Sequence, residues 1–225
     1  MKSKIFIPLF LSACLFILAS CSNKNSSHDS EMKSPMVVGA DTSTHHNMPM
    51  DHDMMASMNM SMQKMESMEM TGDFDLDFAK MMIIHHQSAI DMSEMEIANG
   101  KNDEMKLMAQ KMITAQKEEI SQFQNIINNY KAKSGQDAHH GDGNHKELGE
   151  SMKTMNAKMK SMVMTGDTDK DFVMMMIPHH EGAIVMAEAE INHGAHVELK
   201  QIAGKIITDQ KKEIDALKAW QAKHN

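Results

Sequence analysis

The feature of this sequence that most constrains its fold is an internal duplication. The segment Met70–Asp73 recurs without a gap 94 positions later as Met164–Asp167, and His85-His86 recurs at the same offset as His179-His180. Apolar and charged positions downstream repeat with the same spacing. The chain must therefore be built from two copies of one supersecondary unit.

Each copy predicts a helical hairpin. Gly72 and Gly166 interrupt the chain, and the aspartate that follows each glycine is a good N-cap. Beyond these caps the apolar residues keep helical spacing, and no run alternates with the period of a strand. The predicted long helices cover Phe74–Ala98, Asp103–Lys131, Thr168–Asn192 and Val197–Gln221, and shorter helices cover Asp53–Met70 and Lys146–Met164.

The predicted fold class is all-α. Four long helices joined as two hairpins favour a four-helix bundle built from a duplicated helical hairpin, with the short methionine-rich helices packed on it as accessories. Two separate three-helix units are the alternative. The predicted parts are a signal peptide (1–20), a Met/His-rich disordered tether (21–52), helical repeat 1 (53–132), a Gly/His-rich linker (133–146) and helical repeat 2 (147–225).

The N-terminal segment predicts a lipoprotein signal peptide. A basic start precedes an apolar run from Ile5 to Ala19, which is too short to span a bilayer comfortably. The run ends in Leu18–Cys21, which resembles the bacterial signal that is cut before an acylated cysteine; an ordinary signal peptide is the alternative. We expect a lipid anchor at Cys21 to hold the protein on a membrane of the cell envelope, facing the periplasm or the surface. Ser22, by its resemblance to lipoprotein sorting in two-membrane bacteria, favours the outer membrane.

Methionine is the outlier of the composition. The chain has 29 Met and only 4% aromatic residues, so methionine must supply much of any core. No cysteine follows Cys21, which excludes thiolate metal sites and CxxC redox pairs from the chain beyond it. The net charge is −8 and the sequence contains no arginine. This balance argues against nucleic-acid partners and suits cations.

Each copy places methionine and histidine together on one helix. In the first copy, positions 77, 81, 85, 88 and 92 form one stripe, and positions 78, 82, 86 and 89 form the adjacent stripe. Thioether sulfur and imidazole nitrogen together suit Cu(I) or Ag(I) and are poor ligands for Mg or Ca. Methionine also fills cores well, so we expect one of each adjacent Met pair to bind and the other to pack. The candidate ligands are Met81, Met82, His85, His86, Met92, Met175, Met176, His179, His180 and Met186.

A further Met/His cluster precedes the first long helix. The stretch from His45 to Met55 begins as polar chain, so core packing does not explain its first methionines. The candidate ligands in it are His45, His46, Met48, Met50, His52 and Met54. Two other sets of methionines share a helix face and favour core packing instead. These sets are Met54, Met55, Met58, Met62, Met65 and Met68, and Met152, Met155, Met159 and Met162.

Two motifs resemble a known family. The segment Asp171–Ile184, with the order Asp-Phe-Val-Met-Met-Met-Ile-Pro-His-His-Glu-Gly-Ala-Ile, resembles the hallmark of the domain of unknown function 305 family. Gln210–Ile214 and Gln116–Ile120 resemble its later Gln-Lys-x-Glu-Ile element. The resemblance implies a ferritin-like helical bundle and, because some members are periplasmic copper-binding or copper-resistance proteins, a role with copper. Copy one departs from the pattern at Ile84 and Ser88, and copy two departs at Glu181.

The predicted function is an extracytoplasmic, non-enzymatic copper-binding lipoprotein. We expect it to sequester or buffer Cu(I), with Cu(II) or Ag(I) as alternative ions, and to contribute to copper resistance or homeostasis, with a copper efflux system as a candidate partner. One alternative is a ferritin-like di-iron oxidoreductase, which requires two Glu-x-x-His motifs. Glu190–His193 has that spacing, but its counterpart Glu96–Asn99 lacks the histidine. The other alternative is a structural or interaction lipoprotein with a Met-rich core.

Overall fold

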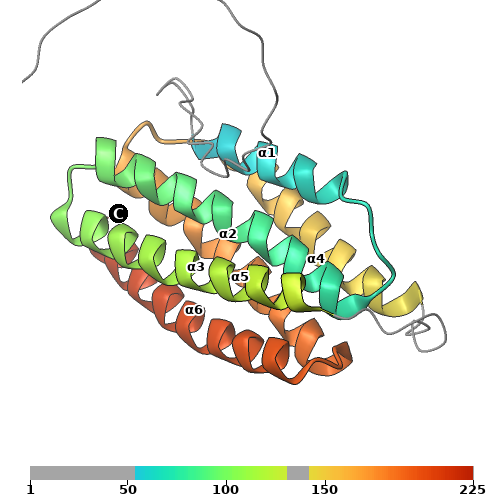
Figure 1. Ribbon diagram of the computed structural model, residues 1–225. Helices are drawn as coiled ribbons and strands as arrows, with labels where there is room; N and C mark the ends of the chain where they lie inside the picture. The colour runs from blue at the N-terminus through green and yellow to red at the C-terminus, as the bar shows by residue number, and fades with distance from the viewer. Residues whose placement is uncertain (1–53, 131–141, 225) are drawn as a thin grey trace, which may run out of the picture. The chain divides into compact units, whose positions relative to one another are not determined.

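The computed structural model describes residues 54–130 and 142–224, which form helices and their connections (Figure 1). The helices are α1 (Met54–Glu66), α2 (Phe74–Asn99), α3 (Asp103–Asn129), α4 (Asp142–Lys160), α5 (Thr168–His193) and α6 (Val197–His224). The predicted signal peptide, Cys21, the tether with its candidate ligands and most of the predicted linker lie outside the described residues. Those candidates are His45, His46, Met48, Met50 and His52.

The four long helices begin at the predicted residues and end within a few residues of the predicted ends. The two short helices differ from the prediction, because α1 ends at Glu66 and α4 covers Asp142–Lys160. The connection after α1 leaves the helical path because its backbone is bound elsewhere. The N–H groups of Thr71 and Gly72 donate to the carboxylate of Asp77, at 2.8 and 3.2 Å.

The duplicated glycine turn has a structural explanation. Gly72 and Gly166 adopt positive φ angles of 83° and 78°, a conformation that other residues rarely accept. Asp73 then caps α2 by accepting from the N–H of Leu76, as predicted, and Asp167 caps α5 in the same way. These requirements fix where α2 and α5 begin, and hence where their histidines lie.

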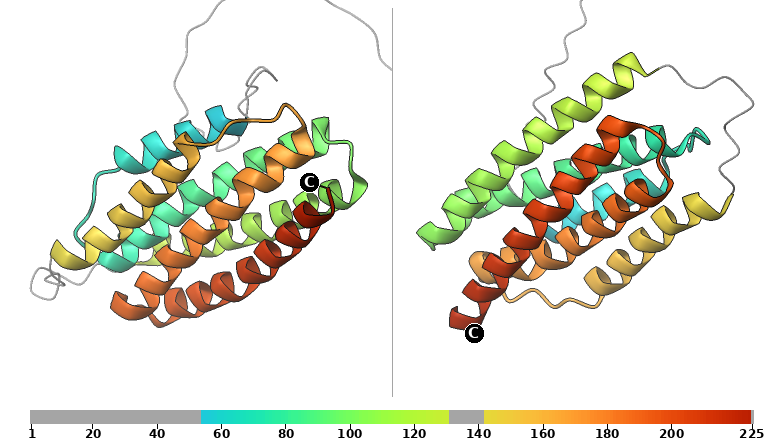
Figure 2. Two further views of the ribbon diagram at one scale, coloured as in Figure 1. Left: turned by 180° about the vertical axis from the view of Figure 1, so that it is seen from behind. Right: turned by 90° about the horizontal axis from the view of Figure 1, so that it is seen from below.

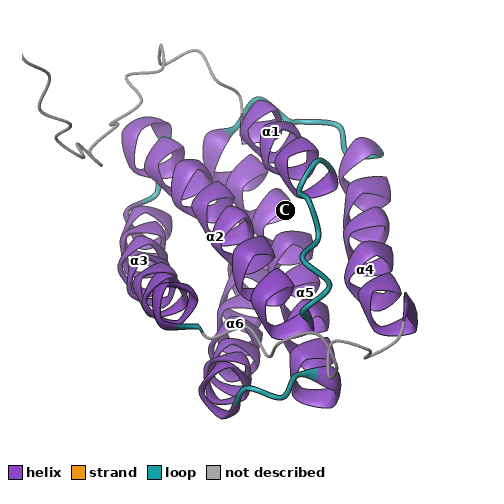
Figure 3. Cartoon of the chain, turned by 45° about the vertical axis from the view of Figure 1, so that its right-hand side comes forward, coloured by secondary structure: helices purple, strands orange, loops and turns teal. Residues whose placement is uncertain are grey.

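Helices α2 and α5 form the middle of the bundle. Helix α3 packs on α2 and α6 packs on α5, while α1 covers α2 and α4 covers α5 from the opposite side. Figures 2 and 3 show α1 and α4 on one side of the central pair and α3 and α6 on the other. Residues 54–130 and 142–224 belong to one compact unit, so the predicted all-α bundle is confirmed and the alternative of two separate three-helix units is wrong.

Crossed hydrogen bonds tie the two halves together. Asp75, near the start of α2, accepts from the N–H groups of Ala195 and His196 in the α5–α6 connection, each at 2.9 Å. Asp169, near the start of α5, accepts from the N–H groups of Lys101 and Asn102 in the α2–α3 connection, at 2.9 to 3.1 Å. A carboxylate near the start of each central helix thus binds the hairpin turn of the other half. These hydrogen bonds hold α2 and α5 against each other.

Methionine supplies much of the core. Met58, Met81, Met82, Met92, Met105, Met112 and Met159 are among the largest fully buried side chains. Two of the few aromatics, Phe78 and Phe123, pack edge to face at 5.8 Å between α2 and α3. In the part of the chain that the structure describes, no helix has the length and apolarity needed to cross a membrane.

Candidate metal centre

Four histidines, two from α2 and two from α5, are buried together between the central helices. The side chains of His85, His86, His179 and His180 have no exposed surface. The rings of His85 and His179 lie against each other, with centroids 3.7 Å apart and planes inclined by 35°. Residues far apart in the sequence thus form one cluster.

Adjacent histidines point in different directions because successive residues on a helix are rotated by about 100°. His85 faces α5, whereas His86 faces α3. In the second copy, His179 faces α2 and His180 faces α6. One histidine of each pair therefore lies in the contact between the two halves, and the other lies inside its own hairpin.

His86 and His180, which lie inside their own hairpins, are each close to a glutamate of the neighbouring helix. Nε2 of His86 lies 3.0 Å from Oε2 of Glu119 on α3, and Nε2 of His180 lies 2.8 Å from Oε2 of Glu213 on α6. Glu119 also accepts from Nζ of Lys205 at 3.0 Å. Burial alone would raise the pKa of Glu119, but His86 and Lys205 hold it below its ordinary value. The carboxylate is thus ionised and orients the ring of His86.

Several ring nitrogens of this cluster have no hydrogen-bond partner. Nε2 of His179 lies 3.2 Å from the carbonyl oxygen of His85, to which it can donate. Nδ1 of His86 and His179 and both nitrogens of His85 and His180 are buried without a hydrogen-bond partner, because Nε2 of His180 lies at ion-pair distance from Glu213 but makes no hydrogen bond with it. A buried polar atom left in this state costs about 1 to 3 kcal/mol. A carboxylate at Nε2 with an open lone pair at Nδ1 is the arrangement that metal-bound histidines adopt.

The two central histidines are held in the neutral form. Burial, together with the neighbouring His86 and His180, lowers the pKa of His85 well below its ordinary range. Burial and the proximity of His85 and His180 do the same to the pKa of His179. A neutral imidazole offers a lone pair to a metal ion, whereas a protonated one does not. The electrostatics of the cluster therefore favour a ligand role at ordinary pH.

The predicted methionine ligands on α2 and α5 lie in the core beside these histidines along the helices. Met81, Met82, Met92, Met175, Met176 and Met186 are at most 2% exposed. Met81 and Met92 share the stripe of His85, and Met175 and Met186 share the stripe of His179, so these four follow the face at which α2 and α5 meet. Met82 and Met176 follow the faces turned toward α3 and α6. Met54 on α1 is 5% exposed and belongs to the hydrophobic core.

The structure adds residues that the sequence did not single out as part of a site. Glu119 and Glu213 belong to the duplicated Gln-Lys-x-Glu-Ile element, but their contact with histidine depends on the packing of each hairpin. Met155 on α4 was assigned to the core, yet its Sδ and Nε2 of His85 both lie beside Gly182 of α5, at 2.8 and 3.7 Å from the position that a Cβ would take there. On the other side, the hydroxyl of Ser88 lies 3.8 Å from Sδ of Met58 on α1. Accessory helices thus bring thioethers toward the histidine cluster.

The donor set fits a soft cation better than a hard one. Within residues 54–130 and 142–224, no three His, Asp or Glu side chains are arranged to hold a metal ion. A site here would need thioethers beside imidazole, which is the donor set that Cu(I) prefers. The two residues of the Glu190–His193 motif, which the di-iron alternative requires as ligands, make other contacts in this structure. Burial and the adjacent Asp75 raise the pKa of Glu190 to about 9, and the ring of His193 packs against Phe74 at 5.7 Å.

Comparison with known families agrees with the geometry. The sequence profile of the domain of unknown function DUF305 matches residues 18–127 and again residues 126–221. The chain belongs to the DUF305 family. The two matches follow the duplication, one for each helical hairpin. A search of curated protein sequences found no match to this DUF305 chain.

Solved structures share the fold of this DUF305 protein. CopM in the apo form is 27% identical with a TM-score of 0.51, and covers 66% of this chain and 96% of its own. CopM in the Cu(I)-bound form gives 27% identity, a TM-score of 0.50 and the same coverage. CopM has also been crystallised in Ag-bound and Cu(II)-bound forms. A DUF305 fragment from Deinococcus radiodurans is 18% identical with a TM-score of 0.50, covers 67% of this chain and 96% of its own, and supports the fold alone.

Proposed function

We propose that this protein binds Cu(I) between α2 and α5 and buffers it without catalysis. The observation that carries the proposal is the set of buried, unpartnered imidazole nitrogens at His85, His86, His179 and His180. Neutral imidazoles and thioethers bind a soft monovalent ion without importing a compensating charge. Bound copper would satisfy the orphaned nitrogens and thereby stabilise the folded state.

Met81, Met92, Met175 and Met186 would complete the coordination. They lie on the same helix stripes as His85 and His179, whereas Met82 and Met176 lie on the stripes that pack on α3 and α6. Glu119 and Glu213 would orient the rings of His86 and His180 and leave Nδ1 of each ring free to bind the metal. Similarity to CopM, which has been crystallised with Cu(I), Cu(II) and Ag, supports a copper-related role and makes Ag(I) a useful probe.

The proposal extends to the setting of the protein. A lipid anchor at Cys21 would place copper binding in the cell envelope, with the outer membrane favoured, where methionine keeps its donor ability and forms no disulfides. The Met/His cluster at His45–Met54 would add weaker sites near the anchor. The bound ion would then contribute to copper resistance or be passed to an efflux system.

The test is a Cu(I) titration of the protein from Ser22 onward against a chromogenic Cu(I) chelator under reducing conditions. The wild type should retain copper in competition, and the double variant His85→Gln/His179→Gln should lose at least one tightly bound equivalent. His224→Gln is the matched control, because its ring stacks on Trp220 at the far end of α6. Unchanged copper retention in the folded double variant would contradict the assignment, and no retention by the wild type would contradict the function.

A further inference from the structure

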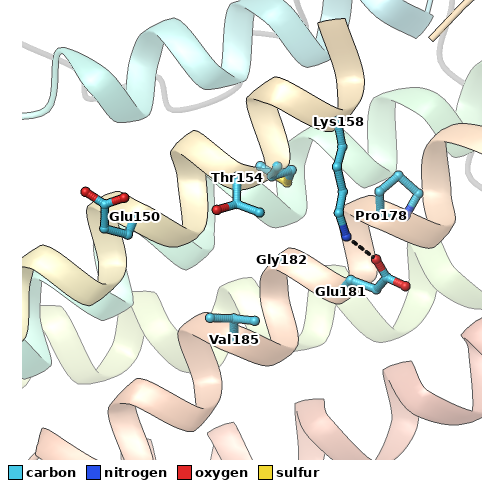
Figure 4. A pocket seen from close by; sticks show the side chains of 8 residues that line it. Glu150, Thr154, Lys158, Pro178, Glu181, Gly182 and Val185 are labelled. Carbon is cyan, nitrogen blue, oxygen red and sulfur yellow. Dashed lines mark hydrogen bonds and ion pairs between the residues drawn. The ribbon is translucent and has the colours of Figure 1, made fainter. Parts of the chain in front are cut away.

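A groove lies between α4 and α5, and its lining includes Gly182, whose Cβ position is near Nε2 of His85. It has a volume of about 330 Å³ and is lined by Glu150, Thr154, Met155, Lys158, Pro178, Glu181, Gly182 and Val185. Figure 4 shows Glu150, Thr154 and Lys158 on α4 opposite Pro178, Glu181, Gly182 and Val185 on α5. Nζ of Lys158 pairs with Glu181 at 2.9 Å, so the rim carries charge while its wall carries thioether and aliphatic groups.

The floor of this groove is a residue without a side chain. A Cβ at Gly182 would lie 2.8 Å from Sδ of Met155 and 3.7 Å from Nε2 of His85. A thioether from α4 and an imidazole nitrogen from α2 therefore converge beside the same point of α5. Any larger residue at position 182 would separate them.

His85 is the part of this arrangement that indicates a ligand. Its ring is fully buried, and neither nitrogen has a hydrogen-bond partner. Met155 is 3% exposed and lines the groove. The sulfur is thus the last donor between the groove and the buried imidazole.

The equivalent position of the first copy is closed. Ser88 replaces glycine there, and its hydroxyl lies 3.8 Å from Sδ of Met58. This hydroxyl engages the sulfur of the accessory helix, whereas Gly182 places no side chain beside the sulfur of Met155. The two copies therefore differ in the side chain that the central helix turns toward its accessory helix.

We propose that Met155 and Nε2 of His85 form a loading site through which a soft monovalent cation, Cu(I) or Ag(I), enters the protein along the α4–α5 groove. The inference rests on the proposed function and adds the route by which the ion reaches the histidines. Solvent ligands of the ion are replaced first by Sδ of Met155 and then by Nε2 of His85, which carries its proton on Nδ1. The oxidation state of the ion does not change. From His85 the ion reaches the ring of His179, which lies in contact with it.

The test compares Met155→Leu with Met159→Leu in the same protein. Both residues are buried on α4, but only Met155 lines the groove, and Met-to-Leu exchange keeps the core volume. Stopped-flow mixing with Ag(I) should show loading slowed at least about tenfold in Met155→Leu, the lower end of what loss of a metal-supporting group costs. Met159→Leu should load like the wild type. Gly182→Ser, which copies Ser88, should slow loading as Met155→Leu does.

A second measurement follows the methionine methyl groups by NMR. In protein labelled at the methionine ε-methyls, the Met155 signal should shift at the first additions of Ag(I), and the Met159 signal should not. If Met155→Leu loads as fast as Met159→Leu in a protein whose binding still depends on His85, the loading site is wrong and the proposed function stands. If the wild type binds no Ag(I) or Cu(I), both are wrong.

Discussion

The stability of the metal-free protein should fall as the pH rises through neutrality, because two buried glutamates keep their protons in the fold. Burial and the adjacent Asp169 raise the pKa of Glu96 to about 8, and burial and Asp75 raise the pKa of Glu190 to about 9. In the unfolded chain both titrate near 4.5. The folded state therefore binds close to two more protons than the unfolded state around pH 6 to 7.

The sign and size follow from proton linkage. A raised carboxyl pKa gives stability that is complete below the unfolded pKa and is lost as the pH rises toward the folded pKa. Each group contributes about 1.4 kcal/mol per pH unit, so the pair contributes about 2.7 kcal/mol per unit. His85 and His179 act in the opposite direction because their folded pKa values are depressed, and since an unfolded histidine is half protonated near pH 6.5 they offset about 0.7 kcal/mol of the loss between pH 6.5 and 7.5. The window from pH 6.5 to 7.5 therefore reports mainly on the glutamates.

Glu190→Gln isolates one of the two groups. The amide resembles the protonated carboxyl in shape and can donate to Asp75, but it takes up no proton. Urea unfolding of the metal-free wild type should show a loss of about 1.9 kcal/mol from pH 6.5 to 7.5, and Glu190→Gln should show about a quarter of that loss. Glu94→Gln is the control, because the side chain of Glu94 is 58% exposed. Equal wild-type stability at the two pH values, or a full slope in Glu190→Gln, would refute the reasoning.

Two further predictions concern copper. Glu119→Gln removes the charge that orients His86, so Cu(I) affinity measured by chelator competition should fall about tenfold or more. Glu118→Gln, on the exposed face of α3, is the control and should leave the affinity unchanged. Equal affinity in both variants would show that His86 is not part of the site. Deletion of residues 22–53 should remove the weaker copper equivalents and leave the tight binding of the helical part intact, and unchanged stoichiometry on titration would show that the tether ligands do not bind.

The sequence alone was enough to predict the helices and their duplication. The caps at Asp73 and Asp167 and the glycine turns are local features, and helical spacing of apolar residues is a property of each segment by itself. The pairing of methionine with histidine was equally local, because a helix fixes which residues share a stripe. These signals predicted the all-α class, the starts of α2 and α5 and the candidate ligands on both helices.

Only the tertiary structure decided what each stripe faces. Helical periodicity gives the direction of His85 and His86 relative to each other, but not the helix that each will meet. The stacking of His85 on His179, the contact of His86 with Glu119 and the approach of Met155 to Gly182 all join separate helices. Such contacts depend on how the helices dock, which the crossed bonds from Asp75 and Asp169 fix between the two halves. The spacing of residues along one helix does not determine how that helix docks on another.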